Sequence, residues 1–275
     1  HTEEYVWQEF REACDYSFAE FKKNNPKKVL DDTGFYLVGE VYNYGISSGK
    51  AFDFGDKKVN YFDKAFNSLI NFEIKWNAKQ QNAQEVFSRY DSLLNTNLKG
   101  YGILNYMSSH DDGMPFDNER KMPFKTAEML LLTPGTSQVY YGDESARELM
   151  VEGTTGDANL RSFMNWDTIE HDEKTKEILN HWQKLGQFRA NHPAIGAGKH
   201  HVISTKNGLV FSRVRKDDKV IVGMNLLRGT KTIDVSSIFK NGAKLRDHFS
   251  NTKFTVKEGK VIFKSDNNLV LLEAY

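Results

Sequence analysis

The stretch that decides the fold is GILNYMSSHDDG, from Gly102 to Gly113, which begins apolar and ends in an imidazole followed by two carboxylates. An apolar run of this length is typical of a buried strand. A strand that places His110 and Asp111 at its carboxyl end, just before a glycine, is how an α/β barrel presents chemical groups at its open face. The structural alternative is a strand followed by an Asp-rich turn, because Asp favours turns.

A second stretch of the same kind comes earlier in the chain. GFYLVGEVY, Gly34 to Tyr42, is predicted to be an apolar strand that offers a single carboxylate, Glu40, among aromatic residues. Two strand ends that each offer an acid predict a pair of carboxylates facing one cleft. Such a pair is the minimum apparatus of a glycosidase.

Composition excludes several classes of partner. Lys and Arg together number 37, as do Asp and Glu, so the chain has no overall field to attract nucleic acid or an anionic membrane. It contains no run of about 18 apolar residues, so we expect no membrane-spanning segment. The single Cys14 excludes an internal disulfide framework. A chain of 275 residues is long enough for more than one domain.

Helical and strand patterns alternate over the first two thirds of the chain. Apolar residues at spacings of three and four predict helices at 2–24, 83–94, 123–132 and 173–190. Strands are predicted at 34–42, at 64–72, from 102 onward and at 138–141. This alternation indicates right-handed βα units and a parallel sheet.

The pattern changes after His192 and Pro193. Helical spacing ends, and short runs of period-two or β-branched character follow at 208–215, 219–226, 254–257, 260–264 and 269–275. Lys257-Glu258-Gly259-Lys260 is a tight hairpin signal. We therefore expect two domains, residues 1–197 and a small antiparallel β domain at 198–275.

Four short motifs occur in a fixed order before this β domain. They are FYLVGE at 35–40, HD at 110–111, VYYGDE at 139–144 and RSFMNWD at 161–167. Together they resemble the strand-five, strand-seven and strand-eight motifs, and the segment that follows them, of the α-amylase family of retaining glycoside hydrolases. The resemblance implies an α/β fold: the second half of a (β/α)₈ TIM barrel, strands 4/5 to 8, followed by a C-terminal antiparallel β sandwich, the family's domain C.

The resemblance departs from the family at its beginning. The family's strand-four motif is Gly-x-Arg-x-Asp-x-x-x-His, whose aspartate is the nucleophile, and His1 stands where the closing histidine belongs. By this alignment the nucleophile lies upstream of residue 1, and the chain is the C-terminal part of an amylase. The alternative is that His1 is an arbitrary first residue.

The resemblance also assigns roles to residues. Glu40 would be the general acid/base, and Asp111 would stabilise the transition state. His110, His1 and Tyr42 would bind the substrate. Proton transfer by Glu40 requires a raised pKa at rest, and we expect neighbouring apolar and aromatic side chains to supply the desolvation. Asp112 is interpreted as a loop or rim residue.

Other residues receive weaker interpretations. Four aromatic side chains are candidate stacking platforms for sugar rings, although core packing explains each singly: Tyr42, Tyr44, Trp76 and Phe116. The acidic pair Asp143-Glu144 is interpreted as structural, with Arg161 as a candidate partner. The histidines lack metal-ligand spacing, so no metal site is predicted. No cofactor is required by this chain, while family members often bind calcium, which is possible in a full-length protein.

We therefore expect part of a retaining hydrolase of α-1,4-glucosidic bonds in starch or maltooligosaccharides, with no measurable activity on its own. Its partners would be the α-glucan substrate and either the missing N-terminal half or a second copy at the open barrel edge. By analogy the protein is secreted, periplasmic or at the cell surface, although no signal is visible in the chain.

Three alternatives remain at this point. One is a non-catalytic glucan-binding relative, against which the presence of both Glu40 and Asp111 argues. The second is a cyclomaltodextrinase, neopullulanase or α-glucosidase branch of the same family. The third is an unrelated metal-assisted hydrolase, which a metal bound to Asp111 and Asp112 would favour.

Overall fold

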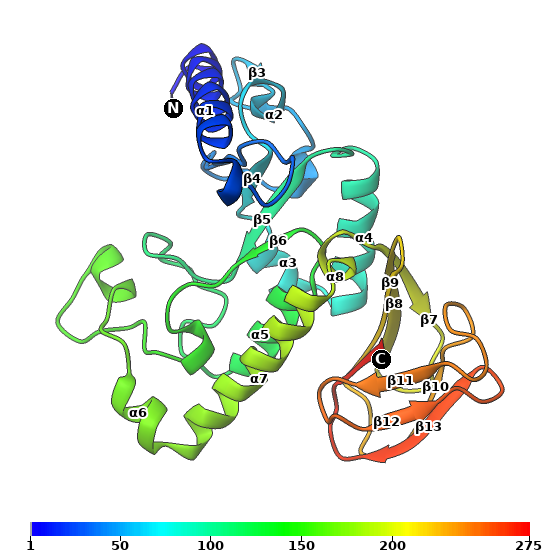
Figure 1. Cartoon of the computed structure of the whole chain (residues 1–275). Helices are drawn as coiled ribbons and strands as arrows, with labels where there is room; N and C mark the ends of the chain where they lie inside the picture. The colour runs from blue at the N-terminus through cyan, green and yellow to red at the C-terminus, as the bar shows by residue number, and fades with distance from the viewer. Residues whose placement is uncertain (1) are drawn as a thin grey trace.

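A computed structural model describes residues 2–275, and in it helices and parallel strands give way to antiparallel strands near residue 199 (Figure 1). A four-stranded parallel sheet has the order β1–β4–β5–β6. Its strands are β1 (Val38–Gly39), β4 (Ser68–Asn71), β5 (Gly102–Tyr106) and β6 (Thr136–Gln138). A separate small hairpin is formed by β2 (Phe52–Asp53) and β3 (Lys58–Val59).

The register of the parallel sheet brings the carboxyl ends of its strands to one edge. Gly39 pairs with Leu69, and Leu69 pairs with Ile103 on the next strand. Because parallel strands run in the same direction, the residues that follow β1 and β5 emerge at the same edge. This edge therefore carries both of the predicted acidic strand ends.

The strands are shorter than the sequence predicted. The strand expected at 34–42 is reduced to β1, which pairs only with β4 in the described chain, so most of that stretch lacks a partner. The strand expected at 64–72 begins at Ser68, because a short helix capped by the Asn60 side chain precedes it. The strand expected at 138–141 lies earlier, at Thr136–Gln138.

Helices flank the sheet and begin at recognisable signals. They are α1 (Glu4–Asn24), α2 (Tyr61–Lys64), α3 (Ile74–Gln80), α4 (Ala83–Asn95), α5 (Pro123–Leu132), α6 (Trp166–His171), α7 (Glu173–Asn191) and α8 (Ala194–Ala197), with 3₁₀ turns at 26–28, 46–48, 143–145 and 156–160. Asn82 and Glu85 form a capping box that starts α4. Pro123 occupies the first turn of α5. Helices α5 and α7 lie side by side (Figure 1).

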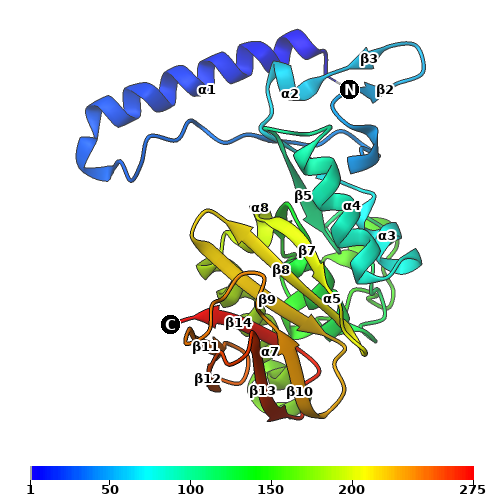
Figure 2. The same ribbon diagram turned by 90° about the vertical axis from the view of Figure 1, so that its right-hand side faces the viewer.

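Helix α1 has the predicted amphipathic pattern, but none of its residues is buried. It is anchored through Arg11, whose guanidinium donates to the Phe35 carbonyl (2.7 Å) and to the Asn67 side chain (2.5 Å). Trp7 packs against Phe66, with 5.2 Å between the ring centroids. Figure 2 shows α1 extending beyond the rest of the molecule, so most of its apolar face is uncovered by the described residues.

A buried polar network ties the sheet to its helices. The Asn71 amide donates to the Asn105 side chain (2.9 Å) and to the Tyr90 hydroxyl (3.0 Å), and Tyr90 donates to Asn77 (2.9 Å). All these groups are shielded from solvent, where a polar atom without a partner is costly. The network therefore fixes α3 and α4 against β4 and β5.

Antiparallel strands form two further sheets. A six-stranded sheet has the order β12–β11–β14–β9–β8–β7, and β10 pairs with β13 alone. The bounds are β7 (Lys199–Ile203), β8 (Leu209–Arg215), β9 (Asp218–Met224), β10 (Gly229–Asp234), β11 (Lys244–Asp247), β12 (Lys253–Thr255), β13 (Lys260–Ser265) and β14 (Val270–Ala274).

Alternate residues of the six-stranded sheet pack on opposite sides, as the period of a strand requires. One face joins the core shared with α4 and α7 through Phe211, Val220, Val222 and Leu271. The other face joins a second core with β10 and β13 through Val210, Ile221, Val270 and Leu272. Phe87 of α4 meets Phe211 edge-on at 5.5 Å, so the two parts of the chain share a hydrophobic core.

The predicted turn at 257–260 is confirmed. Lys257 and Lys260 form an antiparallel bridge, and Glu258 and Gly259 have positive φ angles of 49° and 70°, as a type I′ turn requires. The turn joins two different sheets, because β12 pairs with β11 whereas β13 pairs with β10. The sequence did not reveal β7, β10 or β11, whose residues are mostly polar.

The connection between the two parts of the chain is held by charged groups. His192 follows α7, and its ring nitrogens lie 2.7 Å from the Asp218 carboxylate and 2.6 Å from the Glu273 carboxylate. Arg246 and His248 also contact Glu273. Both carboxylates belong to the antiparallel region, so this cluster fixes how α7 meets it.

Candidate active site at the carboxyl edge of the parallel sheet

Glu40 immediately follows β1 and is exposed. Its position is set by Gly39, which is so close to the Phe66 ring that a Cβ there would lie 2.6 Å from a ring carbon. The neighbours expected to desolvate Glu40 do not enclose it in the described chain. Val41 packs into the core, and Tyr42 is 65% exposed and meets the Phe72 ring edge-on.

His110 and Asp111 lie in the loop after β5, and both side chains are solvent-accessible, at 64% and 44% exposure. The His110 Nε2 atom lies 3.6 Å from the Asp111 carboxylate. The Ser109 hydroxyl donates to the same carboxylate at 2.9 Å, and the Arg161 Nε donates to the His110 carbonyl at 2.9 Å. These contacts orient Asp111 while leaving part of it free to meet a ligand.

Tyr106 connects the two acidic strand ends. Burial raises the pKa of the Tyr106 phenol, and the negative charges of Asp111 and Glu40 raise it further. Its ring also packs edge-on against Phe72 at 5.7 Å, and Phe72 in turn meets Tyr42. Edge-on aromatic contacts therefore run from Tyr106 through Phe72 to Tyr42, which is two residues after Glu40.

A buried cation beneath this edge was missed by the sequence. Lys75 of α3 is 3% exposed and forms an ion pair with Asp112, which also accepts a hydrogen bond from the Tyr106 hydroxyl at 2.6 Å. Burial, assisted by the Lys79 charge, lowers the pKa of Lys75 to about 8. Asp112 thus lies in a loop, as expected, but its carboxylate is also held by two partners that the sequence did not predict. The available signal was the placement of Lys75 and Lys79 four residues apart on one helical face.

Asp143 has a buried, structural environment. Its carboxylate accepts from Arg120 at 2.8 Å and from the Ser108 hydroxyl at 2.5 Å, and it is fully shielded from solvent. The sequence proposed Arg161 as its partner, which is wrong. Arg161 lies on the surface near Asp157 and bonds the His110 carbonyl instead.

The candidate stacking residues separate into two groups. Tyr44 and Phe116 are core residues, at 0% and 2% exposure, so they cannot stack on a ligand. Tyr42 and Trp76 remain accessible, at 65% and 41%. The prediction for His1 lies outside the described residues. Among residues 2–275, no group of three or more His, Cys, Asp or Glu side chains is arranged to hold a metal ion.

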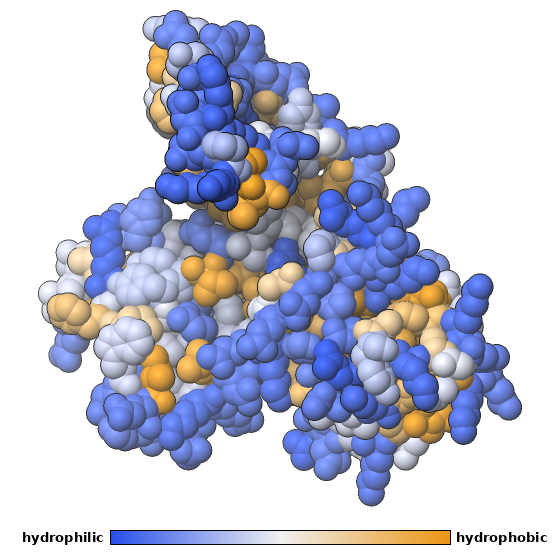
Figure 3. All heavy atoms as spheres, in the orientation of Figure 1, coloured by the Kyte–Doolittle hydropathy of each residue, from blue (hydrophilic) through white to orange (hydrophobic). Residues whose placement is uncertain are grey.

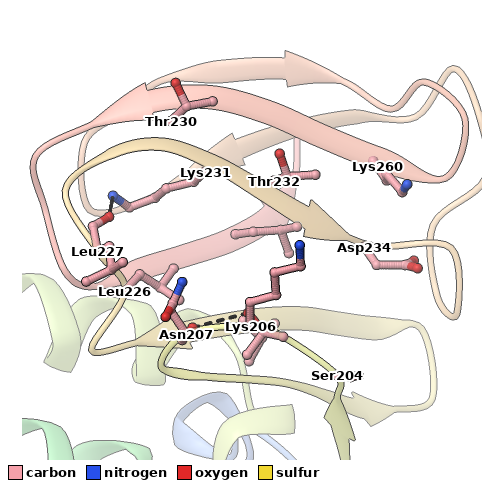
Figure 4. Close-up of a pocket in the computed structure, with 13 residues that line it drawn as sticks. Ser204, Lys206, Asn207, Leu226, Leu227, Thr230, Lys231, Thr232, Asp234 and Lys260 are labelled. Carbon is pink, nitrogen blue, oxygen red and sulfur yellow. Dashed lines mark hydrogen bonds between the residues drawn. The ribbon is translucent and has the colours of Figure 1, made fainter.

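The molecular surface is hollowed between the part that carries α1 and the part that carries α6, and apolar side chains are visible around the hollow (Figure 3). A separate cavity of about 620 Å³ lies in the antiparallel region (Figure 4). It is lined by residues such as Lys206, Thr232 and Asp234 and by none of the predicted site residues. Size alone therefore does not identify the active site.

Two curated proteins resemble the chain in sequence. The periplasmic α-amylase of Escherichia coli (strain K12) is 36% identical over 225 residues, which are 81% of this chain and 31% of that protein. The maltogenic α-amylase of Bacillus acidopullulyticus is 25% identical over 234 residues, which are 80% of this chain and 34% of that protein. The chain thus spans about a third of the length of these relatives. No protein-family profile matches it.

Solved structures agree at the level of the fold. The α-amylase of Geobacillus thermoleovorans in complex with acarbose has a TM-score of 0.62 at 17% identity, covering 99% of this chain and 58% of that one. An Anoxybacillus α-amylase has a TM-score of 0.61 at 19% identity, covering all of this chain and 57% of that one.

The parallel sheet and the antiparallel region that follows it have the fold of these α-amylases. The chain belongs to the α-amylase family, and it corresponds to only part of the length of these family members.

Proposed function

We propose that the chain is the C-terminal part of a retaining hydrolase of α-1,4-glucans such as starch and maltooligosaccharides. The observation that carries the proposal is the register of the parallel sheet, which brings the strand ends before Glu40 and Asp111 to the same edge. Barrel enzymes gather their catalytic groups at this end of their strands. The names of the relatives, a periplasmic and a maltogenic α-amylase, support the substrate class.

Each acidic group has a distinct proposed role. Glu40 protonates the departing glycosidic oxygen and later takes a proton from the attacking water, as a retaining mechanism requires. Asp111 hydrogen-bonds sugar hydroxyls and stabilises the oxocarbenium-like transition state. His110 holds a hydroxyl at the cleavage point, and Tyr42 supplies an exposed ring for the adjacent sugar. The nucleophilic carboxylate lies upstream of residue 1 by the motif alignment.

The activity test uses the full-length parent protein with soluble starch and an activated maltoside. Removing a general acid/base costs about 10²- to 10⁴-fold in rate, so Glu40→Gln is expected to lower kcat by that order, and Asp111→Asn by a comparable amount. Glu152→Gln, an exposed carboxylate in a loop, serves as the control. NMR of the first product is expected to show the retained α anomer. Full activity in Glu40→Gln, or an inverted product, would contradict the assignment.

We further propose that residues 1–275 make up domains 1–197, half of the catalytic barrel, and 198–275, domain C. Strand β1 is an edge strand with β4 as its partner, and residues 2–275 leave most of the apolar face of α1 uncovered, with Phe10 and Phe21 at 48% and 44% exposure. Exposed edges and apolar patches of this kind promote association. In the full-length protein the remaining barrel strands and helices would cover them.

The isolated segment provides a test of this incompleteness. Residues 1–275 alone are expected to show no turnover on either substrate, because the attacking carboxylate and one wall of the cleft are absent. Analytical ultracentrifugation is expected to show self-association, which Phe10→Ser combined with Phe21→Ser reduces. Turnover that survives repurification and is abolished by Glu40→Gln would place the nucleophile within the segment.

The location follows from analogy. A relative that is 36% identical is a periplasmic α-amylase, so we infer that this protein is also periplasmic or secreted. No helix among residues 2–275 has both the length and the apolar character needed to cross a bilayer.

A further inference from the structure

The loop that carries Asp111, residues 107–116, is closed by a small number of hydrogen bonds, and we call it the Asp111 loop. The Phe116 amide donates to the Met107 carbonyl at 2.8 Å, which closes the base of the loop. The Met114 amide donates to one oxygen of Asp112 at 3.0 Å. The Asp112 side chain therefore stabilises the turn in the second half of the loop from within the loop itself.

The other oxygen of Asp112 is held from outside the loop. It accepts from the Tyr106 hydroxyl at 2.6 Å and forms the ion pair with Lys75. A second lysine on the same face of α3, Lys79, donates to the Pro115 carbonyl at 3.2 Å. Helix α3 thus contacts the Asp111 loop at two points, one on each side of Met114.

Burying Lys75 is energetically expensive, because an ammonium group loses its hydration. Its side chain is 4% exposed, and its Nζ lies 5.1 Å from the centre of the Tyr106 ring. A buried ion pair often stabilises a protein no better than an apolar pair of the same shape. The pair does fix the orientation of the Asp112 side chain, because it holds one of its carboxylate oxygens. Asp112 directly follows Asp111 in the sequence, so this contact also restricts the backbone next to Asp111.

We propose that Lys75 is a positioning residue, which holds the Asp111 loop in its productive arrangement through the ion pair with Asp112. The inference rests on the proposed hydrolase function. Without the cation, Asp112 keeps the Tyr106 hydroxyl and the Met114 amide but loses its anchor to α3. Asp111 then samples orientations in which its carboxylate no longer faces the sugar. Because Lys75 is buried, it acts in this proposal through Asp112.

The test compares Lys75→Met, which keeps the length of the side chain, with the parent full-length enzyme. Misplacement of a catalytic group by about 1 Å can cost on the order of a hundredfold in rate, so kcat is expected to fall by roughly ten- to a hundredfold. KM is expected to change by less than about threefold, because the remaining binding groups are intact. Lys75→Arg, which retains the charge, is expected to recover a large part of kcat. Lys64→Met, at an exposed position, is the charge-matched control.

A readout independent of catalysis accompanies the kinetics. Hydrogen exchange at the Met114 and Phe116 amides is expected to accelerate at least about tenfold in Lys75→Met, while the Asn105 amide within β5 stays protected. If Lys75→Met does not fold, Tyr106→Phe removes one bond to the same Asp112 oxygen and is expected to lower kcat several-fold, with faster exchange at Met114.

The outcomes separate this inference from the proposed function. Folded Lys75→Met with kcat and amide exchange unchanged would overturn the positioning role while leaving the hydrolase assignment intact. A merely structural role would lower the melting temperature without lowering kcat of the folded enzyme, and would overturn it as well. A parent enzyme that is inactive on starch and maltosides would instead overturn the proposed function, and exchange at Met114 would still report on the loop.

Discussion

Single residues set the position of Glu40, and Gly39 is the most constrained of them. A Cβ atom at position 39 would lie 2.6 to 2.8 Å from three carbons of the Phe66 ring. The ring cannot easily withdraw, because Trp7 packs against it at 5.2 Å and Tyr61 at 6.5 Å. Since Glu40 is the next residue, any shift of the backbone at Gly39 is transmitted to the proposed acid/base.

Gly39→Ala is therefore expected to destabilise the protein by about 1–3 kcal/mol, the usual cost of overpacking, and to lower kcat in the full-length enzyme. Gly34→Ala is the matched control, since nothing lies within 4 Å of its Cβ position. Thermal denaturation measures both variants. Combining Gly39→Ala with Phe66→Leu is expected to recover part of the loss. If Gly39→Ala and Gly34→Ala were equally stable, the Phe66 ring would have to move away from the new Cβ atom at no energetic cost, and the prediction would be wrong.

Among single residues, the sequence identified those that belong to a short local motif. Glu40, His110 and Asp111 were candidates because each stands at the end of an apolar strand. Lys75 could not be found in this way, because its role depends on a contact across 37 residues with Asp112. Arg161 was paired with the wrong carboxylate for the same reason, since Arg120 reaches Asp143 from a loop that no periodicity describes.

At the scale of elements, local signals determined helices better than strands. Helix α5 was predicted at its observed bounds, because Pro123 starts it and Pro134-Gly135 follows it. Strands depend on partners that are remote in sequence, so the apolar stretch at 34–42 yields a strand of only two residues where β1 meets β4. The polar strands β7, β10 and β11 were not predicted, since tertiary pairing rather than propensity defines them.

Helix α1 was predicted from its apolar face, but the described residues leave most of that face uncovered.

At the scale of the whole molecule, the parallel and antiparallel regions are joined by a shared core and by the charged cluster around His192. Glu273, on β14, is 4% exposed and accepts from His192, Arg246 and His248. Burial alone would raise the pKa of this carboxyl, but the hydrogen bonds from these three groups outweigh it and hold the pKa below its ordinary value of 4.5. The carboxylate form is thus favoured by the folded state.

Because of this pKa shift, the stability that Glu273 contributes to the contact between the two regions depends on pH. A carboxyl group whose pKa is lower in the folded than in the unfolded state contributes stability above the unfolded pKa, and the contribution disappears as pH falls through the folded pKa. The contribution of Glu273 is therefore complete above about pH 4.5 and is lost progressively below it. Asp218 and the imidazole of His192 belong to the same cluster, so protonation of Glu273 also weakens the contact between α7 and the antiparallel sheet.

Glu273→Gln is expected to lower the free energy of unfolding at neutral pH, because His192, Arg246 and His248 then face an uncharged amide. Breaking one partner out of a buried charged cluster typically costs about 3–5 kcal/mol. The difference between the parent and the variant is expected to shrink as pH falls below about 4.5, since the parent then loses the same charge by protonation. Chemical denaturation between pH 3 and 8 measures this difference, with Glu177→Gln, on the exposed side of α7, as the control. A difference that stays constant across that range would mean that the Glu273 charge is not what joins the two regions, and packing of Phe87 on Phe211 would then be the dominant contact.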